Sequence, residues 1–563
     1  MELFEELNEK DALELWLKLA GDCKTTQEKT LLEIVKQAKN TEYGIKHNFS
    51  NIKSIDDFQK EVPISEYDEF EDYIERMADG AKNLLFPGLT NFFISTSGTT
   101  GNSKKIPESD SGLKAKSSVL KLRNAFLIKA VIEKFKTNPR VIKFLKEKEI
   151  NLNNTDSLIN NCHFYSLTSA SPNKKTKGGI DIGFASGKTF ENYAFSKRSS
   201  YPPELMGLAN GEATMYLTML FALRYDDIVL ITSNNAGRFY NRVKYAQKYA
   251  KQIIDDLRNG SISGHIEITS DERKLFESYL KPHPERADEL EKLLNKGIEY
   301  FTPKYYWPNL LVARFWLKGS VGVNVAKLKK YLPDDLLYWD VGYGASEGKL
   351  TIPIKENEGY GTLATSSIFF EFIDENGNIL TADNLKDDCD YEIILTTYSG
   401  LYRYQLHDIV RVKGFFENTP NIEFITKSRE IINIAQEKIP APGILDILTD
   451  FMRNNNLTSR QAQIYPNNDD LCYEIYVELE DSSNVNVLKL SKDFDNVLRE
   501  KFELYGRNRE FESLNEVKII LMKDGWQKSL YDTKDTGNVP RSQIKLEAMI
   551  LKRPDNEWIL KEE

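Results

Sequence analysis

Ser95-Thr-Ser-Gly-Thr-Thr-Gly-Asn-Ser-Lys-Lys-Ile-Pro107 is the most informative segment of this chain. It follows an apolar run at 91–95 that predicts a strand. Its small residues let backbone N–H groups approach an anion, its hydroxyl groups can donate hydrogen bonds, and Lys104 and Lys105 bring positive charge. The spacing of a Walker A loop, Gly-x-x-x-x-Gly-Lys-Ser/Thr, is absent. The segment therefore predicts a phosphate-binding loop of another type, with a polar surface loop as the alternative.

Around this loop, helical and strand-like segments alternate. Apolar residues recur at helical spacing in 10–40, 114–148, 213–223 and 238–257. A short apolar run at 228–232 is typical of a strand. The alternation predicts α/β layering rather than a β-sandwich, and the absence of a fixed-period repeat disfavours solenoids and propellers.

The later part of the chain changes character twice. Between 363 and 425, short β-rich runs dominate, at 368–373, 391–397, 409–412 and 422–425. After Ile434, the pattern predicts helices at 444–454 and 487–504 and strands at 471–479 and 517–522. We therefore expect a large domain over 1–430, with β-sheets flanked by helices, and a small α+β domain over 431–563.

Composition limits the classes of function. The chain has 563 residues, 40% of them hydrophobic, and a net charge of −10, which is typical of a globular protein and disfavours non-specific nucleic-acid binding. No stretch approaches the roughly 18 apolar residues of a membrane helix, and the N-terminus does not resemble a signal peptide. The four cysteines lie far apart without zinc spacing. These features predict a cytoplasmic protein with reduced thiols and with neither a nucleic-acid nor a membrane partner.

Two further segments carry candidate site residues. Tyr343-Gly-Ala-Ser-Glu-Gly348 is a turn of small residues in which Glu347 is either a helix cap or a ligand for Mg²⁺, a hard cation that prefers oxygen ligands. Leu401-Tyr-Arg-Tyr-Gln-Leu-His-Asp-Ile-Val410 places Asp408 where a strand is expected to start. A carboxylate there suits two ribose hydroxyl groups, each of which needs an acceptor.

The combination of these segments, in this order, resembles the adenylate-forming superfamily of acyl-acid ligases. Within it, the chain resembles the Gretchen Hagen family of acyl acid amido synthetases, the auxin-responsive promoter family. Further segments carry this finer resemblance: Tyr201–Glu204, Met215-Tyr216, Asp255–Ser263, Tyr306–Leu310, Trp316–Ser320, Glu437–Ile439 and Ser542–Lys545.

The resemblance implies an adenylating N-terminal domain that binds ATP and the acyl acid, and a mobile C-terminal domain. It implies that Glu347 binds Mg²⁺, that Asp408 holds the ribose, and that Lys545 contacts the reacting phosphate or carboxylate during adenylation. The remaining residues implied to bind ATP are Ser95, Thr96, Ser97, Gly98, Thr99, Thr100, Gly101, Lys104, Tyr343, Gly344, Ala345, Ser346, Lys427 and Lys438.

Three positions depart from the family pattern. His407 replaces the Gly that usually precedes the ribose Asp, and Lys427 replaces an Arg before the hinge, which loses the planar guanidinium fork but keeps the charge. Leu546-Glu547 replaces the Pro-Arg pair that commonly follows the lysine. Because of these departures, full activity is less expected than it would be for a chain with the complete family pattern. The expected fold is unaffected.

The reaction implied by the resemblance has two steps. A carboxylate attacks the α-phosphorus of ATP to give an acyl-adenylate and pyrophosphate, and an amine, typically of an amino acid, then displaces AMP. The alternatives are a ligase that passes the acyl group to coenzyme A or another thiol, and a non-catalytic nucleotide-binding relative. No Ser-His-Asp arrangement is evident among the five histidines. We expect a monomer that uses a carboxylic acid, an amine and ATP with Mg²⁺.

Overall fold

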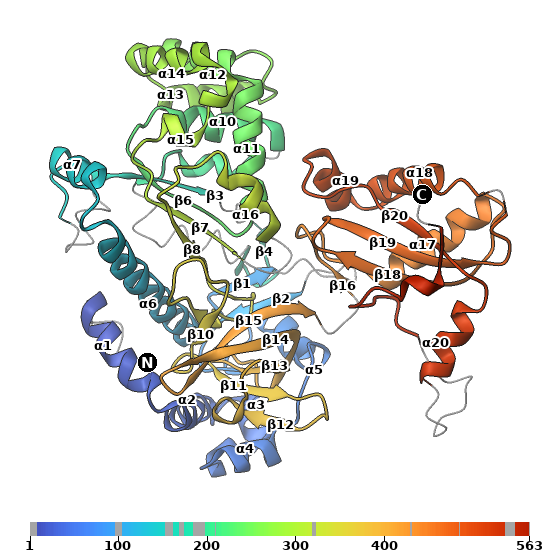
Figure 1. Ribbon diagram of the computed structural model, residues 1–563. Coiled ribbons are helices and arrows are strands. Elements are labelled where there is room, and N and C mark those ends of the chain that lie inside the picture. Colours follow the sequence, from blue (N-terminus) through green and yellow to red (C-terminus); the bar gives the residue numbers. More distant parts are fainter. Residues whose placement is uncertain are drawn as a thin grey trace. The chain divides into compact units, whose positions relative to one another are not determined.

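The computed structural model describes residues 8–95, 104–151, 161–167, 174–183, 198–208, 210–317, 322–427, 431–483, 485–534 and 546–561 (Figure 1). The described residues fall into two compact units, the first ending at Thr426 and the second beginning at Lys427. Among them, no helix combines the length and the apolar character that crossing a bilayer requires.

The first unit begins with helices that pack on an antiparallel sheet. These helices are α1 (Glu9–Ala20), α2 (Cys23–Ala38), α3 (Glu42–Lys46), α4 (Ile55–Glu61) and α5 (Asp68–Ala78). The seven strands follow the order β12-β11-β13-β14-β15-β10-β9. Their bounds are β9 (Thr351–Ile352), β10 (Gly361–Leu363), β11 (Phe369–Ile373), β12 (Ile379–Thr381), β13 (Asp390–Thr396), β14 (Tyr404–Phe416) and β15 (Thr419–Lys427).

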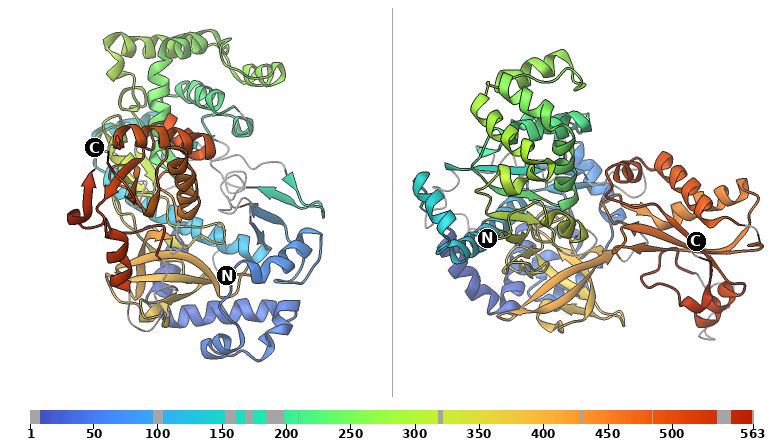
Figure 2. Two further views of the ribbon diagram at one scale, coloured as in Figure 1. Left: turned by 90° about the vertical axis from the view of Figure 1, so that its right-hand side faces the viewer. Right: turned by 45° about the horizontal axis from the view of Figure 1, so that its top comes forward.

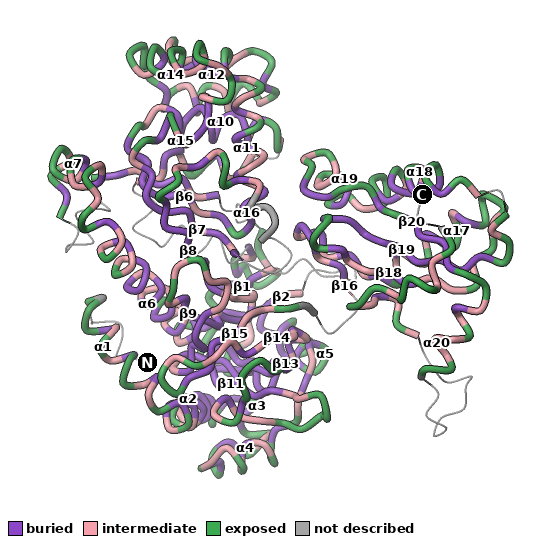
Figure 3. The backbone as a smooth tube through the Cα atoms, viewed as in Figure 1, coloured by how far each residue is buried: buried purple, intermediate pink, exposed green. Residues whose placement is uncertain are grey.

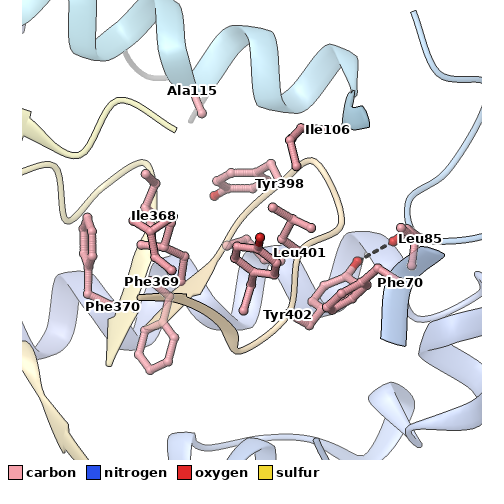
Figure 4. Packing of buried hydrophobic residues seen from close by; sticks show 14 of the residues in the cluster. Phe70, Leu85, Ile106, Ala115, Ile368, Phe369, Phe370, Tyr398, Leu401 and Tyr402 are labelled. Atoms are coloured by element: carbon pink, nitrogen blue, oxygen red, sulfur yellow. Dashed lines mark hydrogen bonds between the residues drawn. The ribbon is translucent and has the colours of Figure 1, made fainter. Parts of the chain in front are cut away.

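Aromatic side chains join the helices to this sheet. Tyr402 is fully buried and its hydroxyl donates a hydrogen bond to the carbonyl oxygen of Leu85 (Figure 4). Tyr398, Ile368 and Ala115 belong to the same buried cluster, which therefore reaches the first turns of α6. Figure 3 shows β11 and β13 in this region as largely buried.

A parallel sheet forms the second layer of the first unit. Its strands β3 (His163–Leu167), β6 (Ile228–Ser233), β7 (Val312–Phe315) and β8 (Leu337–Asp340) lie in that order. Their apolar residues divide between two buried clusters, because both faces of a parallel sheet are covered by helices. Residues of α6 (Asp110–Phe135) and α7 (Pro139–Glu147) cover one face, and α10 (Gly211–Leu223), α11 (Ala236–Lys248) and α16 (Gly322–Lys329) cover the other (Figures 1 and 2).

A smaller sheet carries the predicted phosphate-binding loop. Its order is β2-β1-β5-β4, with β1 (Phe92–Ser95), β2 (Lys105–Glu108), β4 (Lys174–Lys175) and β5 (Asp181–Gly183). β1 and β2 are antiparallel and pair Ser95 with Lys105. The predicted strand before the loop is therefore confirmed.

The remaining helices of the first unit surround α10 and α11. They are α12 (Ala250–Asn259), α13 (Ser270–Tyr279), α14 (Pro284–Lys296) and α15 (Pro303–Tyr306). Short 3-10 turns lie at Phe49–Asn51, Pro203–Gly207, Ile298–Tyr300 and Ala382–Asn384.

The second unit is a four-stranded sheet with helices, as the sequence predicts. The strand order is β18-β19-β20-β21, with β18 (Ser459–Asn467), β19 (Cys472–Leu479), β20 (Lys518–Met522) and β21 (Ile559–Lys561). Its helices are α17 (Ala441–Asn454), α18 (Val487–Lys501), α19 (Glu503–Glu510) and α20 (Trp526–Lys534), with a 3-10 turn at Asn556–Trp558. A short hairpin of β16 (Ile431–Ile432) and β17 (Ile439–Pro440) precedes them.

Three of the predicted helical segments each contain two helices. The segment 10–40 divides after Ala20, where the side chain of Asp22 accepts a hydrogen bond from the backbone N–H of Thr25 and so caps α2. The segment 114–148 divides at Asn138, which caps α7 before Pro139. The segment 238–257 divides between α11 and α12 at Tyr249.

Candidate active site

The side chain of Asp340 anchors the turn that follows β8. Asp340 ends β8, and its carboxylate accepts hydrogen bonds from the N–H groups of Gly342 at 2.6 Å and Leu317 at 2.9 Å. Burial raises the pKa of Asp340 to about 6, and the two N–H groups oppose that shift. Asp340 thus joins the ends of β7 and β8 at the edge where ligands bind in parallel sheets.

Arg123 of α6 holds the same turn from the other side. Its guanidinium donates to three carbonyl oxygens: from Nε to Thr351 at 2.7 Å, and from Nη1 and Nη2 to Val341 and Tyr343, both at 2.9 Å. Gly342 has a φ of +85°, and a Cβ atom there would lie 2.4 Å from Cζ of Arg123. The turn therefore needs glycine both for its conformation and for the space that the guanidinium fills.

Glu347 lies in this turn with its side chain buried. Only 8% of the residue is exposed, and among the described residues no hydrogen bond or ion pair is formed by its carboxylate. A buried carboxylate without a partner is energetically costly unless a cation or donor reaches it. This environment fits the predicted Mg²⁺ ligand, since Mg²⁺ binds through few carboxylates and keeps several waters. The alternative of a helix cap is not supported, because no described helix begins at this turn.

A small pocket lies beside Glu347. It is lined by Gly112, Ala115, Lys116, Val119, Glu347, Gly348, Lys349, Ser367, Ile368, Thr397, Tyr398 and Ser399. Its volume of about 10 Å³ accommodates little more than one water molecule. Burial lowers the pKa of Lys349 to about 7, with further contributions from the neighbouring charges of Arg123 and Lys116. The pocket thus brings one carboxylate and two lysine side chains into a confined space.

Lys116, which lines this pocket, forms a partly buried ion pair. Lys116 pairs with Glu108, whose other carboxylate oxygen accepts a hydrogen bond from the hydroxyl of Ser399 at 2.6 Å. Lys116 also donates to the carbonyl oxygen of Ser346 at 3.3 Å. The pair therefore connects β2, α6 and the turn that bears Glu347.

Asp408 and Tyr343 meet although they lie 65 positions apart. The hydroxyl of Tyr343 donates a hydrogen bond to the carboxylate of Asp408, which is 3% exposed. Burial, followed by the charge of Asp408, raises the pKa of Tyr343 well above its usual value. The structure thus brings two of the predicted nucleotide-binding residues together.

The position of Asp408 differs from the prediction. It lies within β14 and not at the start of a strand. The pairing of β13 with β14 shifts in register here, since Glu392 pairs with Ile409 and Ile394 with Gln405. Between these two pairs, β13 advances by two positions and β14 by four, so β14 contains two extra residues. Such a β-bulge changes the direction of the side chains within it.

His407 occupies the bulge in a left-handed conformation. Its φ is +60°, which explains why glycine is common at this position in the family that the chain resembles. Histidine tolerates this region better than most residues with a side chain. Nδ1 of His407 lies 2.8 Å from Glu392, and Nε2 lies 3.2 Å from Glu66. The departure at 407 therefore keeps the local backbone and adds contacts to two carboxylates.

The predicted phosphate-binding loop is only partly described. Ser95 ends β1, whereas Thr96, Ser97, Gly98, Thr99, Thr100 and Gly101 lie outside the described residues. Nζ of Lys104 lies 4.9 Å from the centre of the Tyr67 ring, a cation–π contact. Lys105 pairs with Glu75 at 2.6 Å.

The second unit contains two of the predicted lysines. Lys438 lies in the β16–β17 hairpin with a φ of +47°. The buried carboxylate of Glu437 orders this hairpin by accepting hydrogen bonds from the N–H groups of Ile434 at 2.8 Å and Ala435 at 2.6 Å. Lys427 is the last residue of β15, and Lys545 lies outside the described residues. The roles of all three stay predictions.

Sequence reasoning missed Arg123, Asp340 and the Lys116–Glu108 pair. In the sequence, Arg123 and Lys116 are two of many charges on a Lys-rich helix, a pattern that is typical of a solvated face. Asp340 ends an apolar run but has no motif of its own. Only the tertiary structure distinguishes these residues from surface charges.

Both the sequence and the fold of this chain are similar to those of known proteins. The model of the GH3 family N-terminal domain matches residues 12–160 and 152–337, and that of the GH3 family central domain matches 361–427. A jasmonoyl–L-amino acid synthetase of Nicotiana attenuata is 25% identical over 461 residues, which cover 77% of this chain and 74% of that protein. A 4-substituted benzoates–glutamate ligase of Arabidopsis thaliana is 24% identical over 438 residues, or 75% and 72% of the two chains.

A solved structure shares the fold over nearly the whole chain. It is that of the GH3.15 acyl acid amido synthetase, with a TM-score of 0.64, 20% identity, and coverage of 98% of this chain and 95% of that one. At this identity the likeness concerns the fold alone, and it confirms the expected architecture of a large α/β part and a small α+β part.

Proposed function

The chain belongs to the GH3 family, and from this membership we propose that it is an ATP- and Mg²⁺-dependent acyl acid amido synthetase. In this proposal it adenylates a carboxylic acid and transfers the acyl group to an amine, most simply that of an amino acid. The names of its relatives support this, since they describe synthetases and ligases that join acids to amino acids.

Two carboxylates of the candidate site support the proposal most directly. The buried and unpaired carboxylate of Glu347 lies in the turn whose first residue, Tyr343, contacts Asp408. In binding ATP, one carboxylate can hold the Mg²⁺ that accompanies the phosphates, and a second can accept hydrogen bonds from the ribose hydroxyl groups. Here both are positioned by one turn.

The first step would join the carboxylic acid to the α-phosphate of ATP. An oxygen of the acid bonds to the α-phosphorus, and the bond from that phosphorus to pyrophosphate breaks. Glu347 would hold Mg²⁺, which supplies positive charge to the phosphates when bound. Asp408 would accept hydrogen bonds from the ribose, and Arg123 would keep the turn in place through its carbonyl groups.

The second step needs no further cation. The amine nitrogen bonds to the acyl carbon, the bond between that carbon and AMP breaks, and the amine proton goes to solvent. We assign adenylation to residues 1–430 and assign residues 431–563, with Lys438 and Lys545, to a part that moves between the steps. The change of unit at Thr426–Lys427 supports this division.

A substrate screen tests the proposed function. The purified protein is incubated with ATP, Mg²⁺ and a panel of carboxylic acids, with amino acids, coenzyme A or neither. Mass spectrometry should detect AMP and an amide when an amino acid is present. A thioester formed with coenzyme A, and no amide, would identify the protein as a thioester-forming ligase. Absence of AMP and of pyrophosphate exchange with every acid would contradict the proposal.

A further inference from the structure

A second group of charged residues lies at the carboxyl edge of the parallel sheet. β6 ends at Ser233, and α11 begins after Asn235, whose side chain accepts a hydrogen bond from the N–H of Gly237 at 2.7 Å. Arg238 and Arg242 follow on α11, four positions apart and thus on one face of the helix. Arg242 is 7% exposed, and Arg238 is partly buried.

In the described part of the chain, the hydrogen-bond acceptors of Arg242 are neutral groups. Arg242 donates from Nε to the hydroxyl of Thr218 at 3.3 Å and from Nη1 to the carbonyl oxygen of Arg238 at 3.0 Å. The phenol groups of Tyr165 and Tyr201 favour the charge on Arg238. Burial and the neighbouring Arg242 lower the pKa of Arg238 to about 10, so it remains charged at neutral pH.

Several guanidinium groups elsewhere in the first and second units have a carboxylate partner or, as at Arg123, three carbonyl acceptors. Arg403 pairs with Glu371 at 2.9 Å, and Arg509 pairs with Asp495 at 2.8 Å. In the part of the chain that the structure describes, no carboxylate forms an ion pair with Arg238 or Arg242. Two like charges in a poorly solvated environment repel each other, and an anion bound between them would offset that cost.

We propose, on the basis of the proposed function, that Arg238 and Arg242 bind a second anionic group of the acyl acid. The substrate class is then acids with two negatively charged groups, such as dicarboxylic acids. One carboxylate is adenylated, and the other lies against the two guanidinium groups, which suit a planar carboxylate.

The topology places the two ends of such an acid at one edge of the sheet. The turn with Glu347 follows β8, α11 follows β6, and only β7 lies between them. Two strand spacings of about 4.8 Å separate β6 from β8. The rings of Tyr165, Phe239 and Trp307 pack together in the buried core and so join α11 to β3.

The α-carboxylate of an amino acid has the same chemistry and is the other source of such an anion. The burial of Arg242 favours the acyl acid, because the acid binds before the amine in the two-step reaction and so can occupy the deeper site. The two sources are distinguished by the pyrophosphate exchange reaction, which needs the acid but no amine.

The first experiment measures binding without turnover. Calorimetry compares glutarate with pentanoate, which has the same chain length and one carboxylate. Loss of a charged hydrogen bond corresponds to roughly a tenfold or greater change in Kd, so Arg238→Gln should weaken glutarate binding by at least about tenfold and leave pentanoate unchanged. Arg238→Lys should lose less affinity for glutarate than Arg238→Gln, because lysine keeps the positive charge. Equal binding of glutarate by Arg238→Gln and the unchanged protein would overturn the proposal.

Arg258→Gln provides the matched control. Arg258 lies on α12, and its charge is paired with Asp288 and Glu291. Replacing Arg258 should therefore leave the binding of glutarate unchanged. Arg242→Gln is the second variant, and circular dichroism checks that it folds, because Arg242 is buried. If Arg258→Gln weakened the binding of glutarate as much as Arg238→Gln does, the effect would be a general one of charge. That result would refute the assignment.

The second experiment separates this inference from the proposed function. Pyrophosphate exchange with glutarate should fall in Arg238→Gln, while exchange with pentanoate stays unchanged. If Arg238-dependent binding of glutarate occurs but no acid supports exchange, the proposed function fails and the anion site remains. If exchange is unaffected and only the KM for the amino acid rises, the site holds the amino acid carboxylate and the inference is wrong.

Discussion

Replacing Gly342 by alanine tests whether Arg123 organises the turn that bears Glu347. The added Cβ would lie 2.4 Å from Cζ of Arg123, so the guanidinium must move away from the carbonyl groups that it binds. Each charged hydrogen bond contributes about 1.5–3 kcal/mol, and a left-handed alanine costs about 1–2 kcal/mol. Loss of two such bonds gives a fall of about 4 kcal/mol or more in the free energy of unfolding, and pyrophosphate release should fall as well.

Gly377→Ala is the matched control for this variant. Gly377 has a φ of +81°, close to the +85° of Gly342, but no heavy atom lies within 4 Å of its added Cβ. It should therefore show only the backbone cost of about 1–2 kcal/mol. Both glycines belong to the first unit, so urea unfolding followed by tryptophan fluorescence reports the same transition for both. A difference below about 1 kcal/mol between the two variants would refute the reasoning about Arg123, because even one charged hydrogen bond exceeds that value.

Three further changes test the assigned site residues. Glu347→Gln should largely abolish acyl-adenylate formation, since an amide is a poorer Mg²⁺ ligand; near-normal pyrophosphate release at saturating Mg²⁺ would contradict this. Asp408→Ala should raise the apparent KM for ATP at least about tenfold, through loss of hydrogen bonds worth on the order of 1.5–3 kcal/mol, whereas His407→Gly should change it less because glycine suits the positive φ. A larger effect at 407 than at 408 would show that the ribose site is misplaced. Lys545→Ala should reduce adenylation by about 10²–10³-fold while amide formation from a supplied acyl-adenylate stays close to normal, and equal losses in single-turnover measurements of the two steps would disprove that separation.

Much of the architecture follows from local pattern. The strand before the phosphate-binding segment, the strand at 228–232 and the small α+β unit were all predictable, because apolar periodicity and turn residues act over a few positions. The divisions within long helical segments were harder to predict. Asn138 before Pro139 is a recognisable stop signal, but at Tyr249 one helix follows another with no cap hydrogen bond from a side chain.

The site was predictable as a set of motifs but not as a geometry. Resemblance to a family pointed to Glu347 and Asp408, yet the contact of Asp408 with Tyr343 depends on a bulge that exists only because β13 and β14 pair out of register. Arg123 likewise acquires its role from three carbonyl groups more than 200 positions away. Long-range pairing of this kind has no signature in a local window of sequence.

The left-handed backbone at position 407 gives a criterion for sorting related sequences. Residues that tolerate positive φ, such as Gly, Asn, Asp and His, allow the strand to keep its bulge and Asp408 to keep its orientation. A β-branched residue at the same position would force the strand to straighten and would turn the next carboxylate away. Among relatives that retain the aspartate, the residue before it therefore indicates whether the aspartate keeps the orientation that the proposed ribose contact requires.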